Sequence, residues 1–391
     1  MTGNIGMGIK IFSFFSGAGF LDFGFEQEKF EIVFVNECNK EFLNAYKFAR
    51  KNMNVKPPKW GYVCNDINCL LKGKPKIWLT EKVTLEKEEG IVGFIGGPPC
   101  PDFSVAGKNE GISGKNGILT NSYKRIILQQ EPDFFVFENV KGLWSTQKHR
   151  KEYEKVKDSF RRKGYILIDR LVNALDYGVP QDRERVILFG IKYQLVDQNR
   201  KAALLKLKNR FSWGMEEKFN QDKRSQCEWP QTNQFAVNSN SLQSVDIIPE
   251  LCIEYWFQRN DVYKHYNADD YFRPRSLDRF ETIQEGDVSK KSFKRLHRWR
   301  YSPTAAYGNN EVHLHPYYAR RLSVAESLAI QSLPKEYVIS KTLSKSDMFK
   351  TVGNGVPYLL ARGVAHSIKQ FCENEVCKGE NKGIFTGRNT K

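Results

Sequence analysis

Short apolar runs alternate with longer amphipathic segments through the first half of this 391-residue chain. The runs KIFSFF, EIVFVNE and IVGFIGG are followed by DFFVFENV, YILIDRLVN and RVILFGI, and segments of helical length lie between most of them. Strands that are apolar on both faces and joined by helical crossovers are typical of a parallel sheet covered on both sides. The pattern therefore predicts an α/β fold with a mostly parallel sheet.

This alternation stops after residue 191. Residues 192–312 are irregular and often polar, whereas apolar residues recur at helical spacing in RLSVAESLAIQSL and VPYLLARGVAHSIKQF near the end. We expect one α/β domain formed by residues 1–191 and 313–391. A smaller, irregular domain of residues 192–312 is expected as an insertion.

The chain carries a surplus of positive charge, with 61 Lys and Arg against 45 Asp and Glu, a formal net charge of +16. Such a surplus favours a polyanionic partner, either nucleic acid or an anionic membrane surface. No apolar run approaches the roughly 18 residues that a membrane-spanning helix needs. The eight cysteines are scattered, which suits a reducing compartment. No zinc or other metal site is expected, because neither Cys64/Cys69 nor Cys372/Cys377 has a neighbouring set of ligands.

The segment Phe15-Ser16-Gly17-Ala18-Gly19 follows the first expected strand. Its two glycines allow a tight turn and close approach of a ligand to free helix N–H groups. Glu37 follows the second strand, where a carboxylate accepts hydrogen bonds from ribose hydroxyls. The ligand is thus expected to contain adenosine, and NAD is disfavoured because Asp22 stands where a third glycine is usual. The alternative is an ordinary tight turn.

Three further segments place reactive groups beside expected strands. Cys100 lies in GGPPCPDFS, a stiff loop at the carboxyl end of a strand, and Glu138 lies in FENV after another. Arg183 and Arg185 alternate in QDRERV. A thiol nucleophile, a carboxyl group and fixed guanidinium donors suit addition to an electron-poor ring. The alternatives are a buried structural cysteine and surface ion pairs.

Eight motifs together resemble the cytosine-C5 methyltransferases, most closely the bacterial DNA enzymes of restriction-modification systems. The motifs occur in the order FSGAG, NEC, NDI, GGPPCPDFS, FENVKGL, VPQDRERV, ARRLSVAESLAIQSLP and VGNGVP, and they span nearly the whole chain. The resemblance implies a Rossmann-like catalytic domain that uses S-adenosylmethionine and an inserted target-recognition domain for duplex DNA.

The resemblance also implies a role for each matching residue. Cys100 would attack C6 of a flipped-out cytosine, Glu138 would bind N3 and the exocyclic amine, and Arg185, with Arg183, would hold O2. The cofactor-binding residues would be Phe15, Gly17, Gly19, Glu37, Asp66, Ile67, Pro98, Asn354 and Val356.

Four positions depart from the common pattern of the family. Ser13 stands where aspartate is frequent, and Phe20 where a third glycine is frequent. Pro101 stands where glutamine often follows the nucleophile, and Ala325 where arginine often precedes Glu326. The first two concern cofactor contacts and Pro101 concerns a contact near the base, but no group required by the chemistry is missing.

A basic segment at residues 290–300 has six Lys or Arg and no acidic residue, interleaved with aromatics. This composition suits phosphate contact with some stacking, although a solvated charged face is the alternative. The expected DNA-binding residues are Ser104, Lys290, Lys291, Lys294, Arg295, Arg298, Arg300 and Thr304.

Two rival functions remain. The tRNA-methylating branch typically carries Cys-Phe-Thr in its target region, whereas this region has Cys227-Glu228 and Cys252-Ile253. A catalytically inactive DNA-binding homologue is disfavoured because the four catalytic candidates are present. We expect a cytoplasmic bacterial enzyme that acts on duplex DNA as a monomer, with a cognate restriction endonuclease as a further candidate partner.

Overall fold

A seven-stranded sheet forms the centre of the larger lobe in the computed structural model, which describes residues 8–99, 115–239, 246–305, 307 and 312–376. The strands are β1 (Ile9–Phe14), β2 (Glu31–Asn36), β3 (Tyr62–Val63), β4 (Ile91–Gly96), β5 (Phe134–Val140), β6 (Tyr165–Asn173) and β8 (Glu184–Lys192). Their order across the sheet is β3-β2-β1-β4-β5-β8-β6. The predicted α/β class is confirmed.

Strands β1 to β5 pair in parallel, and β8 is antiparallel to both β5 and β6. The predicted mostly parallel sheet is therefore confirmed, with one reversed strand. Only residues 174–183 join β6 to β8, and so short a connection suits antiparallel pairing, whereas a parallel pair needs a long crossover. The strand order changes direction between β1 and β4, and open α/β sheets bind their ligands outside the carboxyl ends of strands at such a point.

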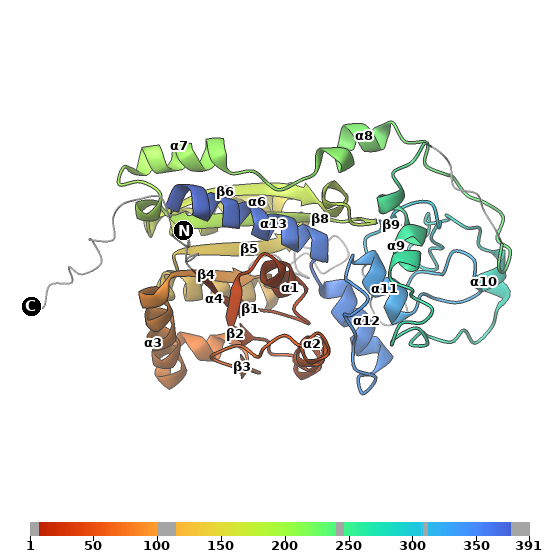
Figure 1. Cartoon of the computed structure of the whole chain (residues 1–391), viewed down its shortest axis with the longest axis horizontal. Coiled ribbons are helices and arrows are strands. Elements are labelled where there is room, and N and C mark those ends of the chain that lie inside the picture. The colour runs from red at the N-terminus through yellow and green to blue at the C-terminus, as the bar shows by residue number, and fades with distance from the viewer. Residues whose placement is uncertain (1–7, 100–114, 240–245, 306, 308–311, 377–391) are drawn as a thin grey trace, which may run out of the picture.

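Helices cover both faces of the sheet (Figure 1). On one face, α3 (Gly73–Glu89), α4 (Lys115–Gln130) and α6 (Gln147–Arg162) pack on strand residues such as Phe12, Phe94 and Phe135. On the other, α1 (Phe20–Gln27), α2 (Lys40–Asn52), α7 (Arg200–Arg210) and α13 (Tyr358–Phe371) pack on residues such as Ile11 and Ile95. Neighbouring strand residues thus supply two separate cores, as alternation along a strand requires.

The smaller lobe lies beside the carboxyl edge of the sheet and holds few regular elements (Figure 1). Its core joins α9 (Ile253–Arg259), α11 (Val324–Ile330) and α12 (Lys345–Asn354). The two-residue strand β9 (Ser302–Pro303) pairs with β7 (Gln181–Asp182) of the larger lobe. The remaining elements are η1 (Ile67–Leu71), α5 (Gly142–Ser145), η4 (Ala174–Tyr177), η5 (Tyr193–Leu195), η6 (Glu217–Phe219), α8 (Gln221–Ser225), η7 (Pro249–Leu251), α10 (Asp278–Thr282) and η8 (Cys372–Val376).

The boundaries between the hydrophobic clusters do not coincide with the predicted domain limits at residues 192 and 313. Ala203, Leu207, Phe211 and Trp213 pack with the sheet, because α7 contributes to its core. Residues 322–352 pack in one cluster with α9 of the smaller lobe and with residues of α1 and α2, such as Phe20 and Ala45. The chain returns to the sheet with α13, and the division into domains stays a prediction.

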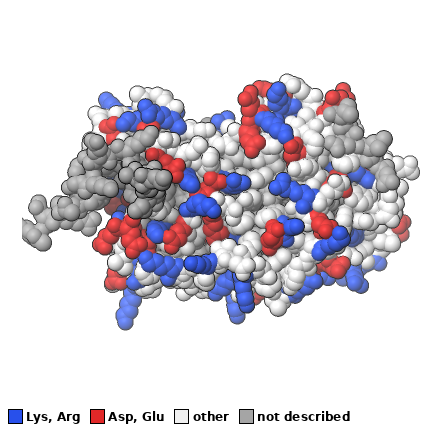
Figure 2. Space-filling view, viewed as in Figure 1, with Lys and Arg blue, Asp and Glu red and all other residues white. Residues whose placement is uncertain are grey.

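Charges of both signs are interspersed over the face that Figure 2 shows. The surplus of 61 basic over 45 acidic side chains is therefore not gathered into one patch on this face. Within the described residues, no helix is both long and apolar enough to span a membrane. The same part of the chain holds no cluster of three or more His, Cys, Asp or Glu suited to a metal ion.

Candidate active site

The segments with predicted chemistry follow the carboxyl ends of β1, β2, β4 and β5. Because these strands are parallel neighbours, their following loops meet at one edge of the sheet. The cofactor candidates follow β1 and β2, the loop that leads to Cys100 follows β4, and Glu138 lies near the end of β5. Cys100, Pro101 and Ser104 themselves lie outside the described residues.

The loop after β1 turns through three residues with left-handed backbone: Phe15 has φ 52°, Gly17 has φ 56° and Gly19 has φ 81°. A side chain on Gly19 would overlap the ring of Tyr46, so glycine is required there for two reasons. A Cβ on Gly17 would meet no atom within 4 Å, which leaves this part of the loop open to a ligand.

The carboxylate of Glu37 is held by two backbone donors. Its Oε2 accepts from the N–H of Gly17 at 2.9 Å, and its Oε1 accepts from the N–H of Asn39 at 2.7 Å. Asn39 is also the N-cap of α2, so the transition from strand to helix fixes the carboxylate. Each oxygen keeps a lone pair for a further donor, as a ribose hydroxyl would require.

The adenine candidates differ in exposure. Asp66 is exposed and caps η1, where its Oδ1 accepts from the N–H of Asn68 at 2.7 Å. Ile67 is buried against the sheet. The side chain of Asn36 links this region to β2, because its Nδ2 donates to the carbonyl of Asn65 at 2.9 Å.

The C-terminal candidates lie against the first helix. Asn354 is exposed at the end of α12, and Val356 is buried in the sheet core. A side chain on Gly355, between them, would overlap the ring of Phe20 at the start of α1. The departure at Phe20 is thus accommodated, because its ring fills space that glycine leaves open at residue 355.

Glu138 is buried with its carboxylate against the backbone of Gly97. A Cβ on Gly97 would lie 2.5 Å from Glu138 Oε2, and Arg185 Nε lies 3.0 Å from Glu138 Oε1. Burial raises the pKa of Glu138 above its usual 4.5, although Arg185 and Arg183 act to lower it. The structure thus places a carboxyl group of raised pKa and Arg185 beside the segment that leads to Cys100. Pro98, also buried, accepts a hydrogen bond from Asn139 Nδ2 at 3.4 Å.

Arg183 points elsewhere. Its guanidinium is fully buried and donates to the carbonyls of Ala305 at 2.9 Å, Gly353 at 2.8 Å and Gly355 at 3.1 Å. Burial holds its pKa well below the usual range, with the charge of Arg185 adding to that effect. Both terminal nitrogens are therefore engaged with backbone from distant segments, which is the geometry of a positioning residue.

The sequence profile of the C-5 cytosine-specific DNA methylase family matches residues 9–370. The chain belongs to this family. It is therefore a DNA cytosine-5 methyltransferase, as the sequence motifs predicted, and this part of the prediction is confirmed.

Relatives of this methylase cover most of its length. It is 52% identical to the Type II methyltransferase M.NmeDI of Neisseria meningitidis serogroup C, over 95% of this chain and 86% of that protein. It is 32% identical to the Type II methyltransferase M.FnuDI of Fusobacterium nucleatum, over 93% and 94%.

Solved structures share the fold. One is described as a DNA modification methyltransferase encoded within a prophage of E. coli, with a TM-score of 0.63, 19% identity and coverage of 93% of this chain and 99% of that one. Another is the Entamoeba histolytica methyltransferase EhMeth, with a TM-score of 0.57, 14% identity and coverage of 94% and 98%. At these identities the likeness shows the fold alone.

The side chains of the basic segment, residues 290–300, differ in exposure. Lys290 and Lys291 are exposed, and Lys294 and Arg300 are partly exposed. Thr304 donates its hydroxyl to the carbonyl of Asp182 at 2.7 Å. Its oxygen keeps lone pairs for another donor.

Arg295 and Arg298 require a correction, because both are buried. Arg295 donates to backbone carbonyls, among them that of Ile283 at 2.8 Å, and Arg298 Nη2 lies 2.7 Å from Glu285 Oε2. Neither guanidinium group can contact a phosphate without losing these buried hydrogen bonds of the smaller lobe. These two arginines stabilise the smaller lobe, and the predicted phosphate contact does not apply to them.

The departure at Ser13 also has a structural explanation. Its hydroxyl donates to Oδ1 of the fully buried Asp22 at 2.8 Å, and the hydroxyl of Tyr46 donates to Oδ2 at 3.0 Å. An aspartate at position 13 would face this carboxylate. Ala325 is buried in α11, and the carboxylate of the next residue, Glu326, is bound instead by Arg320 at 2.7 Å.

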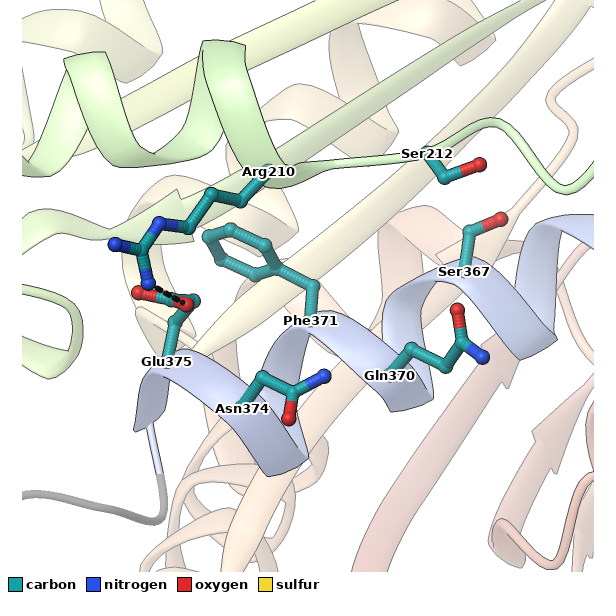
Figure 3. A pocket seen from close by; sticks show the side chains of 7 residues that line it. All are labelled: Arg210, Ser212, Ser367, Gln370, Phe371, Asn374 and Glu375. Carbon is teal, nitrogen blue, oxygen red and sulfur yellow. Dashed lines mark hydrogen bonds and ion pairs between the residues drawn. The ribbon is translucent and has the colours of Figure 1, made fainter.

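Two hollows in the surface lie away from these residues. One, of about 240 Å³, lies between α7 and α13 and includes the ion pair of Arg210 and Glu375 (Figure 3). It includes Gln370, whereas the cofactor candidates meet the opposite end of α13, and a 14-residue helix is about 21 Å long. The other lies between α4 and α6 and is lined by residues of both charges.

Proposed function

We propose that this methylase transfers the methyl group of S-adenosylmethionine to C5 of a flipped-out cytosine in a specific duplex DNA sequence. One observation carries the proposal: the buried Glu138 carboxyl lies between Arg185 and the backbone of Gly97, at the start of the loop that bears Cys100. This arrangement shares the carboxyl edge of the sheet with the loop at residues 15–19 and with Glu37.

The residues around the loop after β1 suit an adenosine-containing cofactor. The hydroxyl of Ser16 is buried and has no hydrogen-bond partner among the described residues, and Gly17 is open on the side where a Cβ would stand. A bound ligand with polar groups would supply that partner. S-adenosylmethionine supplies an activated methyl group when bound. The residues proposed to hold it are Phe15, Gly17, Gly19, Glu37, Asp66, Ile67, Pro98, Asn354 and Val356.

In the proposed reaction, the thiolate of Cys100 forms a bond to C6 of the cytosine, which makes C5 nucleophilic. Glu138, whose pKa is raised by burial, donates to N3 and stabilises the electron density that moves onto the ring. Arg185 donates to O2. Once C5 carries the methyl group, the C5 proton passes to water, its electron pair restores the C5–C6 double bond, and the Cys100 thiolate is expelled. Arg183 positions the segments around Ala305 and Gly355 and does not contact the base.

The proposed DNA contacts are Ser104, Lys290, Lys291, Lys294, Arg300 and Thr304. Extruding a base costs a few kcal/mol, which contacts in the pocket offset. Two relatives named Type II methyltransferases support a role as the modification enzyme of a restriction-modification system. We further propose that the enzyme acts as a monomer in the cytoplasm, beside an endonuclease that cleaves the same site.

Transfer of label from tritiated S-adenosylmethionine tests this function. The wild type, Cys100→Ser, Glu138→Gln and the control Glu184→Gln are each incubated with duplex DNA or with tRNA. We expect label in DNA only, loss of label with Cys100→Ser, and a decrease of about 10²-fold or more with Glu138→Gln. Glu184, whose partner is the exposed Lys141, should behave as wild type when replaced. Label in tRNA alone, or DNA labelling that survives Cys100→Ser, would contradict the proposal.

A further inference from the structure

We propose that Tyr337 and Arg50 are positioning residues that hold the cofactor loop, residues 15–19, in its binding conformation. The inference rests on the proposed use of S-adenosylmethionine. It concerns two side chains from outside the loop, one from the smaller lobe and one from α2.

The loop needs external support because its backbone is strained. Phe15 adopts φ 52°, and a non-glycine residue in this left-handed region is disfavoured by contact between its Cβ and the backbone. Gly17 and Gly19 are also left-handed, and glycine gains the most conformational freedom when it is released. A loop of this kind keeps one shape only where the surroundings impose it.

Tyr337 fixes the peptide between Ala18 and Gly19. Its side chain is fully buried, and its hydroxyl donates to the carbonyl of Ala18 at 2.5 Å. The other end of the same peptide is also engaged, since the N–H of Gly19 donates to the carbonyl of Ser16 at 2.8 Å. Burial raises the pKa of Tyr337, so the hydroxyl stays a donor.

The Tyr337 ring adds a second contact to the same segment. It meets the ring of Phe20 edge to face, with centroids 5.2 Å apart and an interplanar angle of 86°. Tyr337 lies 319 positions along the chain from Ala18. The smaller lobe therefore contributes directly to the shape of the loop.

Arg50 fixes the next carbonyl. Its Nη2 donates to the carbonyl of Gly19 at 2.7 Å, while its Nε pairs with Glu26 Oε2 at 3.0 Å. The guanidinium lies over the ring of Tyr46, 4.5 Å from the centroid, and this ring occupies the space beneath Gly19. The carbonyls of Ala18 and Gly19 are thus both turned toward the protein interior. With these carbonyls held, the N–H of Gly17 stays directed at Glu37.

A binding measurement tests the role of Tyr337 without DNA. Tyr337→Phe removes one hydroxyl and keeps the ring against Phe20. Tyr165→Phe is the matched control, because Tyr165 is equally buried and its hydroxyl donates to the carbonyl of Pro132 at 2.6 Å, away from the loop. Both variants lose one buried hydrogen bond and should lose similar thermal stability.

Calorimetric titration with S-adenosylmethionine then separates the two. We expect Tyr337→Phe to raise Kd by about 2- to 12-fold, which is the range for one neutral buried hydrogen bond, because binding must now order the loop. Tyr165→Phe should leave Kd within about 2-fold of wild type. In assays, Tyr337→Phe should raise KM for the cofactor and leave kcat at saturation nearly unchanged.

The outcomes distinguish this inference from the proposed function. Equal Kd values for Tyr337→Phe and Tyr165→Phe would overturn the positioning role while the proposed cofactor stands. Absence of binding to the wild type would overturn the proposed cofactor and this inference together.

Arg50→Lys tests the role of Arg50. This variant keeps the charge beside Glu26 but loses the planar donor pair, so it should also raise Kd. An unchanged Kd for that variant would exclude Arg50 from the role.

Discussion

Gly97 leaves room for the carboxylate of Glu138, the proposed general acid. Gly97→Ala would place a Cβ 2.5 Å from Glu138 Oε2, and the carboxylate cannot simply rotate away because Arg185 Nε holds its other oxygen at 3.0 Å. We expect kcat to fall by about 10- to 100-fold, since small displacements of reacting groups have effects of this size. Steady-state methylation of DNA measures it.

Gly8→Ala serves as the control for Gly97→Ala. A Cβ on Gly8 would meet only the flexible end of the Lys10 side chain, at 3.6 Å. The kcat of the Gly8→Ala variant should equal that of wild type. If Gly97→Ala retains full kcat, the carboxylate of Glu138 is not fixed where the structure places it.

Asp22 predicts a pH dependence of stability. Burial raises its pKa above 3.8, although Arg50, Ser13 and Tyr46 act to lower it. The folded state therefore holds the proton more strongly than the unfolded state. This contribution to stability is present at low pH and is lost as pH rises through the raised pKa. Because Asp22→Asn removes the titration, its melting temperature should rise relative to wild type as pH increases from 4 to 8.

Asp287 provides the comparison of opposite sign. Hydrogen bonds from Ser289 lower its pKa below 3.8, so its contribution is lost as pH falls. The difference in melting temperature between Asp287→Asn and wild type should thus become less negative toward acid pH. A difference for Asp22→Asn that is flat from pH 4 to 8 would show that its pKa is not raised.

At the scale of residues, the sequence predicted which chemical groups belong to the site better than it predicted which atoms each side chain contacts. Glu138 and Arg185 do meet in the structure, at 3.0 Å. Arg183 and Arg295 have the same chemistry in the sequence, yet both are buried on backbone carbonyls. A run of charged residues carries no information on which members turn inward, because that depends on carbonyls supplied by distant segments. The contact of Tyr337 with Ala18 was beyond prediction for the same reason.

At the scale of elements, the contact of α1 with α13 sets how the C-terminal segment returns to the sheet. A Cβ on Gly24 would lie 2.6 Å from the backbone carbonyl carbon of Ala361. In an exposed helix, Gly→Ala stabilises by about 1 kcal/mol. We expect Gly24→Ala to destabilise the methylase by about 1–3 kcal/mol instead, because the two helices must separate. Urea unfolding measures the difference.

Gln27→Ala on the exposed side of the same helix is the control for Gly24→Ala. Replacing this exposed glutamine should change the free energy of unfolding by less than about 0.5 kcal/mol. A Gly24→Ala variant as stable as wild type would mean that α13 does not pack closely on α1.

Strands were easier to predict than helices or strand directions. The apolar runs correctly indicated β1, β2, β4, β5, β6 and β8. An apolar run does not show in which direction its strand crosses the sheet, so the reversal of β8 could not be predicted. α3 was not predicted either. Its apolar residues do not form one stripe: Ile77 and Leu85 are exposed, whereas Leu79 and Val83 are buried.

At the scale of the whole molecule, four histidines whose pKa is lowered by folding lie in the smaller lobe. His265, His297, His313 and His315 all belong to the smaller lobe, and burial lowers the pKa of each. The pKa of His313 falls to about 3, with Lys294 adding to the effect of burial. His315 lies 3.5 Å from Glu326, but burial and the charges of three arginines still lower its pKa.

As pH falls, the smaller lobe should therefore lose stability before the sheet does. A histidine whose pKa is lowered by folding binds a proton in the unfolded state at pH values where the folded state does not, so its stabilising contribution is lost as pH falls below about 6.5. Between pH 6.5 and 4.5, hydrogen exchange corrected for intrinsic rates should increase first in peptides from residues 253–330 and later in β1 and β4. His313→Gln should reduce this pH dependence, and replacement of the exposed His366 should not. Equal loss of protection in both lobes would mean that these four histidines do not govern acid unfolding.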